Sequence, residues 1–162
     1  MIRPLDPVTD LDAVIAAYSE AADYWTMAEG TAPDATSAAT FFTDCPPGGD
    51  PARSHRLGLF VGNRLSGLAE LSFGFPTAKD AYLGQMILAP RIRGSGHGRT
   101  LLAEVERRAR AEGARDLYLA VLDVNARGRA FWEREGFRAT GVSLFDEDTG
   151  HLIHRMVKPL TL

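Results

Sequence analysis

A chain of 162 residues with 45% hydrophobic and 24% charged residues has the composition of a soluble globular protein, and we expect residues 1–162 to form a single domain. The net charge of −3 excludes the overall basic character of a nucleic-acid-binding domain. The N-terminus has no apolar signal core, no apolar run is long enough to span a membrane, and the single cysteine, Cys45, allows no internal disulfide, so the expected location is cytoplasmic, with no nucleic-acid or membrane partner.

The first third of the chain is predicted to be mainly helical. Asp10 can cap a helix that reaches about Ala28, because apolar side chains recur at helical spacing from Leu11 onward. A weaker helical pattern covers 33–42. The segment 44–51 is rich in proline and glycine, so we expect it to form a loop that joins the helices to a sheet.

From residue 55 onward the pattern changes to that of β-strands, and Gly62-Asn63 is a favoured two-residue hairpin turn. The run 81–88 is nearly all apolar, which is typical of a central strand covered on both faces. A helix that follows it, to about Glu112, and the next strand complete a βαβ unit. Its two strands should be parallel and joined by a right-handed crossover.

The last part of the chain predicts one more helix, over 126–135, with Gly136 as its stop. Asp123 either caps this helix or attracts a cationic substrate, and capping is the favoured role. Two strands then form a closing hairpin. The predicted strands are 55–61, 65–73, 81–88, 117–122, 141–145 and 151–157. The expected fold is therefore of the α/β class, with one mixed central sheet that contains the βαβ unit and is flanked by helices.

Three glycines and three arginines mark the junction between strand 81–88 and the following helix. They are Gly94, Gly96, Gly98, Arg91, Arg93 and Arg99. Glycine amides can approach a ligand closely, and a helix N-terminus carries about half a positive charge, so the turn favours an anionic phosphate group. Acidic residues are preferred at a helix start, so their absence here also indicates that a ligand supplies the negative charge. A P-loop lysine and the third glycine of a dinucleotide fingerprint are both missing, and a purely structural turn is the remaining alternative.

Two sequence blocks resemble those of the GCN5-related N-acetyltransferase (GNAT) superfamily. The first, Arg93-Gly94-Ser95-Gly96-His97-Gly98 with Pro90 before it, matches the coenzyme A motif Arg/Gln-x-x-Gly-x-Gly/Ala. The second begins at Asn125-Ala126 and ends at Gly136-Phe137. The close resemblance covers 81–137, and the order of the elements extends it loosely over the whole chain.

This resemblance implies a pose for acetyl-CoA, which is the expected co-substrate. The backbone of Met86 and Leu88 would pair with the pantetheine arm, and Asn125 would hydrogen-bond to it. The acetyl thioester would lie where the two central strands splay apart. The pyrophosphate would be held by the backbone amides of Arg93, Gly94, Ser95, Gly96, His97, Gly98, Arg99 and Thr100.

The resemblance also implies direct attack of a neutral amine on the thioester, with the amide of Leu88 stabilising the oxyanion. Trp132 stands where many members carry a tyrosine as general acid. An indole has no accessible proton to give, so this side chain either hydrogen-bonds to the sulfur or packs against Phe137, which should touch it if Gly136 adopts a left-handed conformation. Strand 81–88 contains no acid, so Glu70 on the neighbouring strand is the candidate general base. The alternative is a glutamate that is exposed at the sheet edge or forms an ion pair.

The expected acceptor is a primary amine of a small molecule or peptide. Tyr24, Trp25 and Phe41-Phe42 either line its pocket or pack in the core. The alternatives are an acetyltransferase for protein N-termini or lysines and a non-catalytic coenzyme A-binding module. No metal is expected, because the four histidines form no ligand set. The resemblance allows a homodimer, for which the sequence shows no interface.

Overall fold

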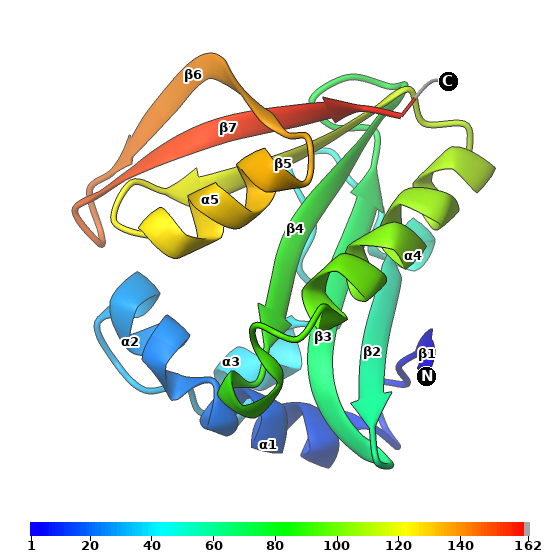
Figure 1. Ribbon diagram of the computed structural model, residues 1–162, viewed down its shortest axis with the longest axis vertical. Coiled ribbons are helices and arrows are strands. Elements are labelled where there is room, and N and C mark those ends of the chain that lie inside the picture. The colour runs from blue at the N-terminus through cyan, green and yellow to red at the C-terminus, as the bar shows by residue number, and fades with distance from the viewer. Residues whose placement is uncertain (161–162) are drawn as a thin grey trace.

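A computed structural model describes residues 1–160, in which helices flank one mixed sheet (Figure 1). The seven strands lie in the order β1-β2-β3-β4-β5-β7-β6. They are β1 (Ile2–Pro4), β2 (His55–Val61), β3 (Arg64–Phe73), β4 (Asp80–Leu88), β5 (Asp116–Leu122), β6 (Arg138–Asp146) and β7 (His151–Pro159). The helices are α1 (Leu11–Glu20), α2 (Ala22–Glu29), α3 (Ala35–Thr40), α4 (His97–Ala111) and α5 (Ala126–Arg134), with short 3-10 turns at Pro51–Arg53 and Pro90–Ile92.

The predicted mixed α/β fold is confirmed. β4, α4 and β5 form the βαβ unit, and β4 and β5 are neighbouring parallel strands. The other neighbouring strands are antiparallel. Gly62 and Asn63, with φ angles of 58° and 63°, make the predicted tight turn between β2 and β3, because this turn type needs positive φ at both positions.

Each face of the sheet is covered by its own apolar core. Successive strand residues point to opposite faces, so Ala69 packs in the core under α4 and Leu68 in the core under α1–α3. The α4 core includes the stripe that the sequence predicts, with Leu101 and Val105 fully buried. Burial of this stripe orients α4 and positions its N-terminus beside the end of β4 (Figure 1).

The predicted single helix over residues 10–28 is wrong, because α1 ends at Glu20 and α2 begins at Ala22. The N–H of Ala21 is shared between the carbonyls of Ala17 and Tyr18, which tightens the last turn of α1 and ends the helix. Trp25 on α2 then packs on the Tyr18 ring, with 4.6 Å between the ring centroids. The contact between these aromatic rings accompanies a break that helix propensity did not indicate.

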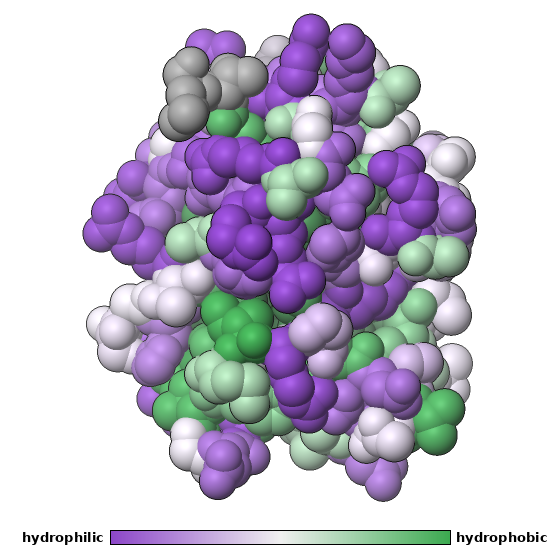
Figure 2. Space-filling view, turned by 90° about the vertical axis from the view of Figure 1, so that its right-hand side faces the viewer, coloured by the Kyte–Doolittle hydropathy of each residue, from purple (hydrophilic) through white to green (hydrophobic). Residues whose placement is uncertain are grey.

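The outer surface of α4 is charged. Glu104 pairs with Arg107 and Arg108, each at 2.8 Å. Figure 2 looks onto the side of the molecule that carries α4, where hydrophilic side chains dominate the upper part of the surface and hydrophobic ones gather in its lower part. No helix within residues 1–160 is both long and apolar enough to cross a membrane.

Candidate active site

The two parallel central strands run together only at their beginnings. Within residues 1–160, pairing between β4 and β5 covers only Asp80–Tyr82 and Asp116–Tyr118. On its other edge β4 stays paired with β3 as far as Leu88. The second half of β4 therefore has one edge that β5 does not cover, so the expected splay of the central strands is present.

The backbone of Met86 and Leu88 faces this uncovered edge. The N–H of Ala89 donates to the carbonyl of Ser66 at 2.8 Å, and polar groups alternate between the two edges of a strand, so those of Met86 and Leu88 point away from β3. The Leu88 carbonyl accepts a hydrogen bond from Arg93 Nε at 3.0 Å. The N–H of Leu88 and the backbone of Met86 thus remain to pair with an extended ligand.

The N-terminus of α4 is open toward solvent. No side chain caps it, its first turn has no acidic residue, and its N-cap, Gly96, has a φ of 87°. A Cβ added at Gly94 or Gly96 would meet no atom within 4 Å. Gly98 serves a different purpose, because a Cβ there would lie 3.2 Å from Leu88 and 3.3 Å from Phe131. The first two glycines give the turn its shape and an unobstructed backbone, and the third allows close packing.

The arginines of the turn, which the sequence predicts as positive charge for a ligand, have acidic partners elsewhere in the chain. Arg91 Nε donates to Glu20 at 2.6 Å, and Arg93 donates to both carboxylate oxygens of Asp23 at 2.5 and 3.2 Å. These two arginines tie the turn to α1 and α2 instead of offering free charge. Arg99 is the most open of the three, with 80% of its side chain exposed, although its Nε lies 3.6 Å from a carboxylate oxygen of Glu135.

The polar side chains of the turn bond mainly to its own backbone. Ser95 Oγ donates to the Ile92 carbonyl at 2.8 Å, and Thr100 Oγ1 donates to the Gly96 carbonyl at 3.2 Å. His97 is the first residue of α4 and is half-buried. What the turn offers a ligand is its backbone N–H groups, and the phosphate-binding role of residues 93–100 stays a prediction.

Asn125 caps α5, because its side-chain oxygen accepts the N–H of Gly128 at 3.0 Å. Its side-chain NH₂ group is left as a donor for a ligand. The expectation that Asp123 caps this helix is wrong. The Asp123 carboxylate instead lies 2.8 Å from Nε2 of His154 on β7.

Trp132 packs against Phe137, which is one of the two alternatives given for this side chain. Gly136 has a φ of 99°, and the N–H of Phe137 donates to the Trp132 carbonyl at 3.0 Å, which is the hydrogen bond of a Schellman helix ending. The rings of Trp132 and Phe137 meet edge to face with centroids 5.4 Å apart. The helix ending therefore accounts for this tryptophan without a chemical role.

Glu70 is buried at the point where β4 bulges. In the strand register Glu70 lies opposite Gln85 and Leu71 lies opposite Leu83, so Gly84 is the extra residue of the bulge. Glu70 is 4% exposed, and a Cβ added at Gly84 would lie 1.8 Å from its Oε2 atom. The side chain of Glu70 thus occupies the space that only a glycine leaves at position 84.

Burial raises the pKa of the Glu70 carboxyl above its usual range. The hydroxyl of Ser72 donates to this carboxylate, the Arg56 guanidinium lies 3.8 Å away, and both offset the rise in part. Glu70 therefore combines both roles that the sequence left open, because it belongs to a buried ion pair and also has a pKa shifted toward that of a useful base.

A cavity of about 500 Å³ opens on the helical side of the bulge. Its wall comes from α2, the α2–α3 loop, α3, the segment after α3, and β4. The lining residues are Tyr24, Trp25, Ala28, Glu29, Thr31, Ala32, Pro33, Asp34, Ser37, Thr40, Asp44, Gly84 and Gln85. Of the predicted aromatic candidates, Tyr24 and Trp25 line this cavity. All four, with Phe41 and Phe42, also pack in the α1–α3 core.

Tyr18 fixes one side chain of this wall. Its hydroxyl donates to Oε1 of Gln85 at 2.7 Å, and burial raises the pKa of the Tyr18 hydroxyl. Sequence reasoning missed Tyr18 and Gly84. The helical spacing of Tyr18 shows only that it is buried, and a glycine within an apolar strand is the one signal that indicates a bulge.

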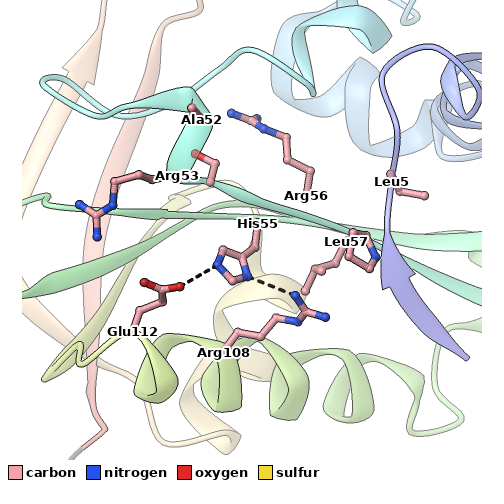
Figure 3. Close-up of a pocket in the computed structure, with 10 residues that line it drawn as sticks. Leu5, Ala52, Arg53, His55, Arg56, Leu57, Arg108 and Glu112 are labelled. Atoms are coloured by element: carbon pink, nitrogen blue, oxygen red, sulfur yellow. Dashed lines mark hydrogen bonds and ion pairs between the residues drawn. The ribbon is translucent and has the colours of Figure 1, made fainter.

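A second cavity, of about 410 Å³, lies between α4 and the start of β2 (Figure 3). His55 stands between Arg108, 3.2 Å from its Nδ1, and Glu112, 3.5 Å from its Nε2. The two cavities share no lining residue, and these charged groups of the second cavity already interact with one another. Within residues 1–160 no cluster of three or more His, Cys, Asp or Glu side chains could hold a metal ion.

Residues 14–137 match the model of the acetyltransferase (GNAT) family, and the chain belongs to this family. No curated protein sequence matches the chain. Among solved structures, it is similar to an acetyltransferase from Thermus thermophilus, with 25% identity and a TM-score of 0.76 over 98% of this chain and 96% of that one.

Two further structures share the fold at lower identity. One is the ribosomal-protein-S18-alanine N-acetyltransferase from Escherichia coli, with 19% identity, a TM-score of 0.74, and coverage of 100% of this chain and 94% of that one. The other is the PaiA N-acetyltransferase from Thermoplasma acidophilum in complex with coenzyme A, with 23% identity, a TM-score of 0.71, and coverage of 98% of both chains.

Proposed function

We propose that this protein transfers an acetyl group from acetyl-CoA directly to a primary amine of a small molecule or peptide. The observation that carries the proposal is the uncovered edge of β4 at Met86 and Leu88 beside the uncapped N-terminus of α4. An extended pantetheine arm and an anionic pyrophosphate are the two groups that such neighbouring sites suit. Membership in the family and the coenzyme A-bound structural relative support the same assignment.

The residues present fit coenzyme A. The open backbone of Gly94 and Gly96 leaves room for the phosphates, and the first amides of α4 point at them. Arg99 supplies the exposed positive charge, and the NH₂ group of Asn125 is available for the pantetheine. Bound there, acetyl-CoA supplies the acetyl thioester that the amine attacks.

Glu70 is proposed as the general base. Its carboxylate lies directly under Gly84, which lines the cavity of the acceptor side, so a single water can carry the amine proton to it. We propose the N–H of Leu88, which the resemblance implies, as the oxyanion donor, and the backbone of Met86 as a partner of the pantetheine. Trp132 packs against Phe137 and takes no part in proton transfer.

The proposal is tested by titrating acetyl-CoA into the protein in a calorimeter and comparing Arg99→Glu with Arg99→Gln. Position 99 is in the first turn of α4, where a glutamate favours the helix, and both variants lose the same exposed ion pair with Glu135. Arg99→Glu should therefore keep the fold while placing a negative charge where the pyrophosphate is proposed to bind. We expect at least about tenfold weaker binding for Arg99→Glu and a much smaller loss for Arg99→Gln. Saturable binding that is equal in both variants, or no wild-type binding, would contradict the proposal.

A non-catalytic coenzyme A-binding module is distinguished by the thiol released in the presence of amines. Turnover that falls well over tenfold in Glu70→Gln, with acetyl-CoA affinity unchanged, supports the enzyme and its base. Binding without release of thiol with any amine would leave a binding module only.

A further inference from the structure

The cavity on the acceptor side carries charge of one sign. Its lining includes Glu29, Asp34 and Asp44 and no lysine, arginine or histidine. Within residues 1–160 none of these three carboxylates forms an ion pair, whereas Glu20 and Asp23 nearby in sequence are both paired. A cleft lined by one sign of charge concentrates ligands of the opposite sign.

Two further features of the wall indicate that a bound molecule completes it. Glu29 is the last residue of α2, and a carboxylate at a helix C-terminus is disfavoured by the partial negative charge there, which a bound cation would relieve. Trp25 lines the cavity, and within residues 1–160 its buried Nε1 has no hydrogen-bond partner. A rotation of this side chain toward the cavity would let an oxygen of a bound molecule accept from it.

Arg56 does not neutralise this charge. It donates to the backbone carbonyls of Phe41 and Asp44, and its guanidinium lies 3.8 Å from the Glu70 carboxylate. At Glu70 the positive charge of Arg56 lowers the pKa more than the negative charge of Asp44 raises it, so Arg56 acts mainly on the proposed base. The charge of the cavity lining itself stays negative.

We propose that the acceptor is an amine with a second nitrogen that stays protonated, held among Glu29, Asp34 and Asp44. This substrate class rests on the proposed function, and the chemistry explains the need for two nitrogens. The attacking nitrogen must be neutral, so negative side chains cannot serve it while it reacts. They instead hold a second ammonium group, and the aromatic wall of Tyr24 and Trp25 suits the chain between the nitrogens. Acceptors with a carboxylate or phosphate are repelled.

The test compares diaminobutane, butylamine and γ-aminobutyrate, together with their longer homologues. These acceptors differ in the charge of the group far from the reacting amine. Rates are followed by thiol release from acetyl-CoA, and affinities by calorimetry with the coenzyme A-loaded protein. Because the three carboxylates are exposed, each is expected to contribute a few-fold preference, and all three together about tenfold in favour of the diamine.

The variant is the triple change Glu29→Gln, Asp34→Asn and Asp44→Asn, in which Asn keeps the cap of α3. The control is Glu112→Gln, the same chemical change in the other cavity (Figure 3). We expect the diamine preference to disappear in the triple variant, to remain in the control, and to weaken as salt is raised.

The inference is overturned if butylamine equals the diamine in both rate and affinity, or if the triple variant keeps the preference. The proposed function fails separately, by the absence of acetyl-CoA binding. In that case diaminobutane is titrated into the ligand-free protein. Binding that is lost in the triple variant would still show that this cavity selects dications.

Discussion

Adding one methyl group at Gly84 should displace the proposed base. Gly84 is the unpaired residue of the β4 bulge, and an ideal Cβ there lies 1.8 Å from Oε2 and 3.0 Å from Cδ of Glu70. No contact can be that short, so in Gly84→Ala the carboxylate must leave its place. It then loses the N–H of Gly84 and its contacts with Ser72 and Arg56.

The expected cost follows from overpacking a buried site, which lowers the free energy of unfolding by about 1–3 kcal/mol. For a domain of this size the melting temperature should fall by about 2–4 °C per kcal/mol. Urea denaturation measures the cost of Gly84→Ala in the wild type and in a Glu70→Ala background. In that background the obstructing side chain is gone, so the added cost should drop below about 0.5 kcal/mol.

The same variant should lower the rate of acetyl transfer at least about tenfold. Its affinity for acetyl-CoA should stay unchanged, because the proposed phosphate-binding turn, residues 93–100, lies elsewhere in the chain. An equal destabilisation by Gly84→Ala in both backgrounds would show that the glycine is required for the backbone of the bulge and not for the Glu70 side chain. Full activity of a folded Gly84→Ala protein would refute the assignment of Glu70 as base.

Three further outcomes are expected. The pKa of Glu70 is higher in the folded state than in the unfolded state. The free energy of unfolding of the wild type, relative to that of Glu70→Gln, should therefore be highest below the ordinary carboxyl pKa and should fall as pH rises through the folded pKa. Urea denaturation of both proteins across pH measures this difference. Trp132→Phe should keep the rate within about threefold, since the ring only packs on Phe137, and a loss of a hundredfold or more in a stable protein would indicate contact with the sulfur. Asp34→Ala should cost about 1 kcal/mol in thermal unfolding through loss of the α3 cap, and Asp34→Asn almost nothing.

The glycine turn, the helix that follows it and the ending of α5 could be predicted because their signals are local. The glycines at 94, 96 and 98, the apolar stripe of α4 and the Gly136-Phe137 helix ending each act within a few residues of the chain. The charge of the turn could not be predicted in the same way. Arg91 and Arg93 are neutralised by Glu20 and Asp23, about seventy residues earlier, and no spacing in the sequence reveals a pairing of that range.

The break at Ala21 was missed for a related reason. Alanine is the strongest helix former, so neither propensity nor periodicity indicates an end there. The packing of Trp25 on Tyr18 accompanies the break and sets the direction of α2. That direction matters for function, because α2 carries Tyr24, Trp25 and Glu29 to the wall of the cavity.

The acceptor side therefore depends on contacts between distant segments, with Gly84 at their meeting point. One bulge residue lines the cavity, leaves space for Glu70 on the other strand, and lies next to Gln85, which Tyr18 of α1 holds in place. The glycine turn is tied to the same helices, because Arg91 pairs with Glu20 of α1 and Arg93 with Asp23 of α2. Dependence on contacts between distant segments gives a physical reason why the sequence does not reveal the acceptor, and why the charge of the cavity is the more direct guide to it.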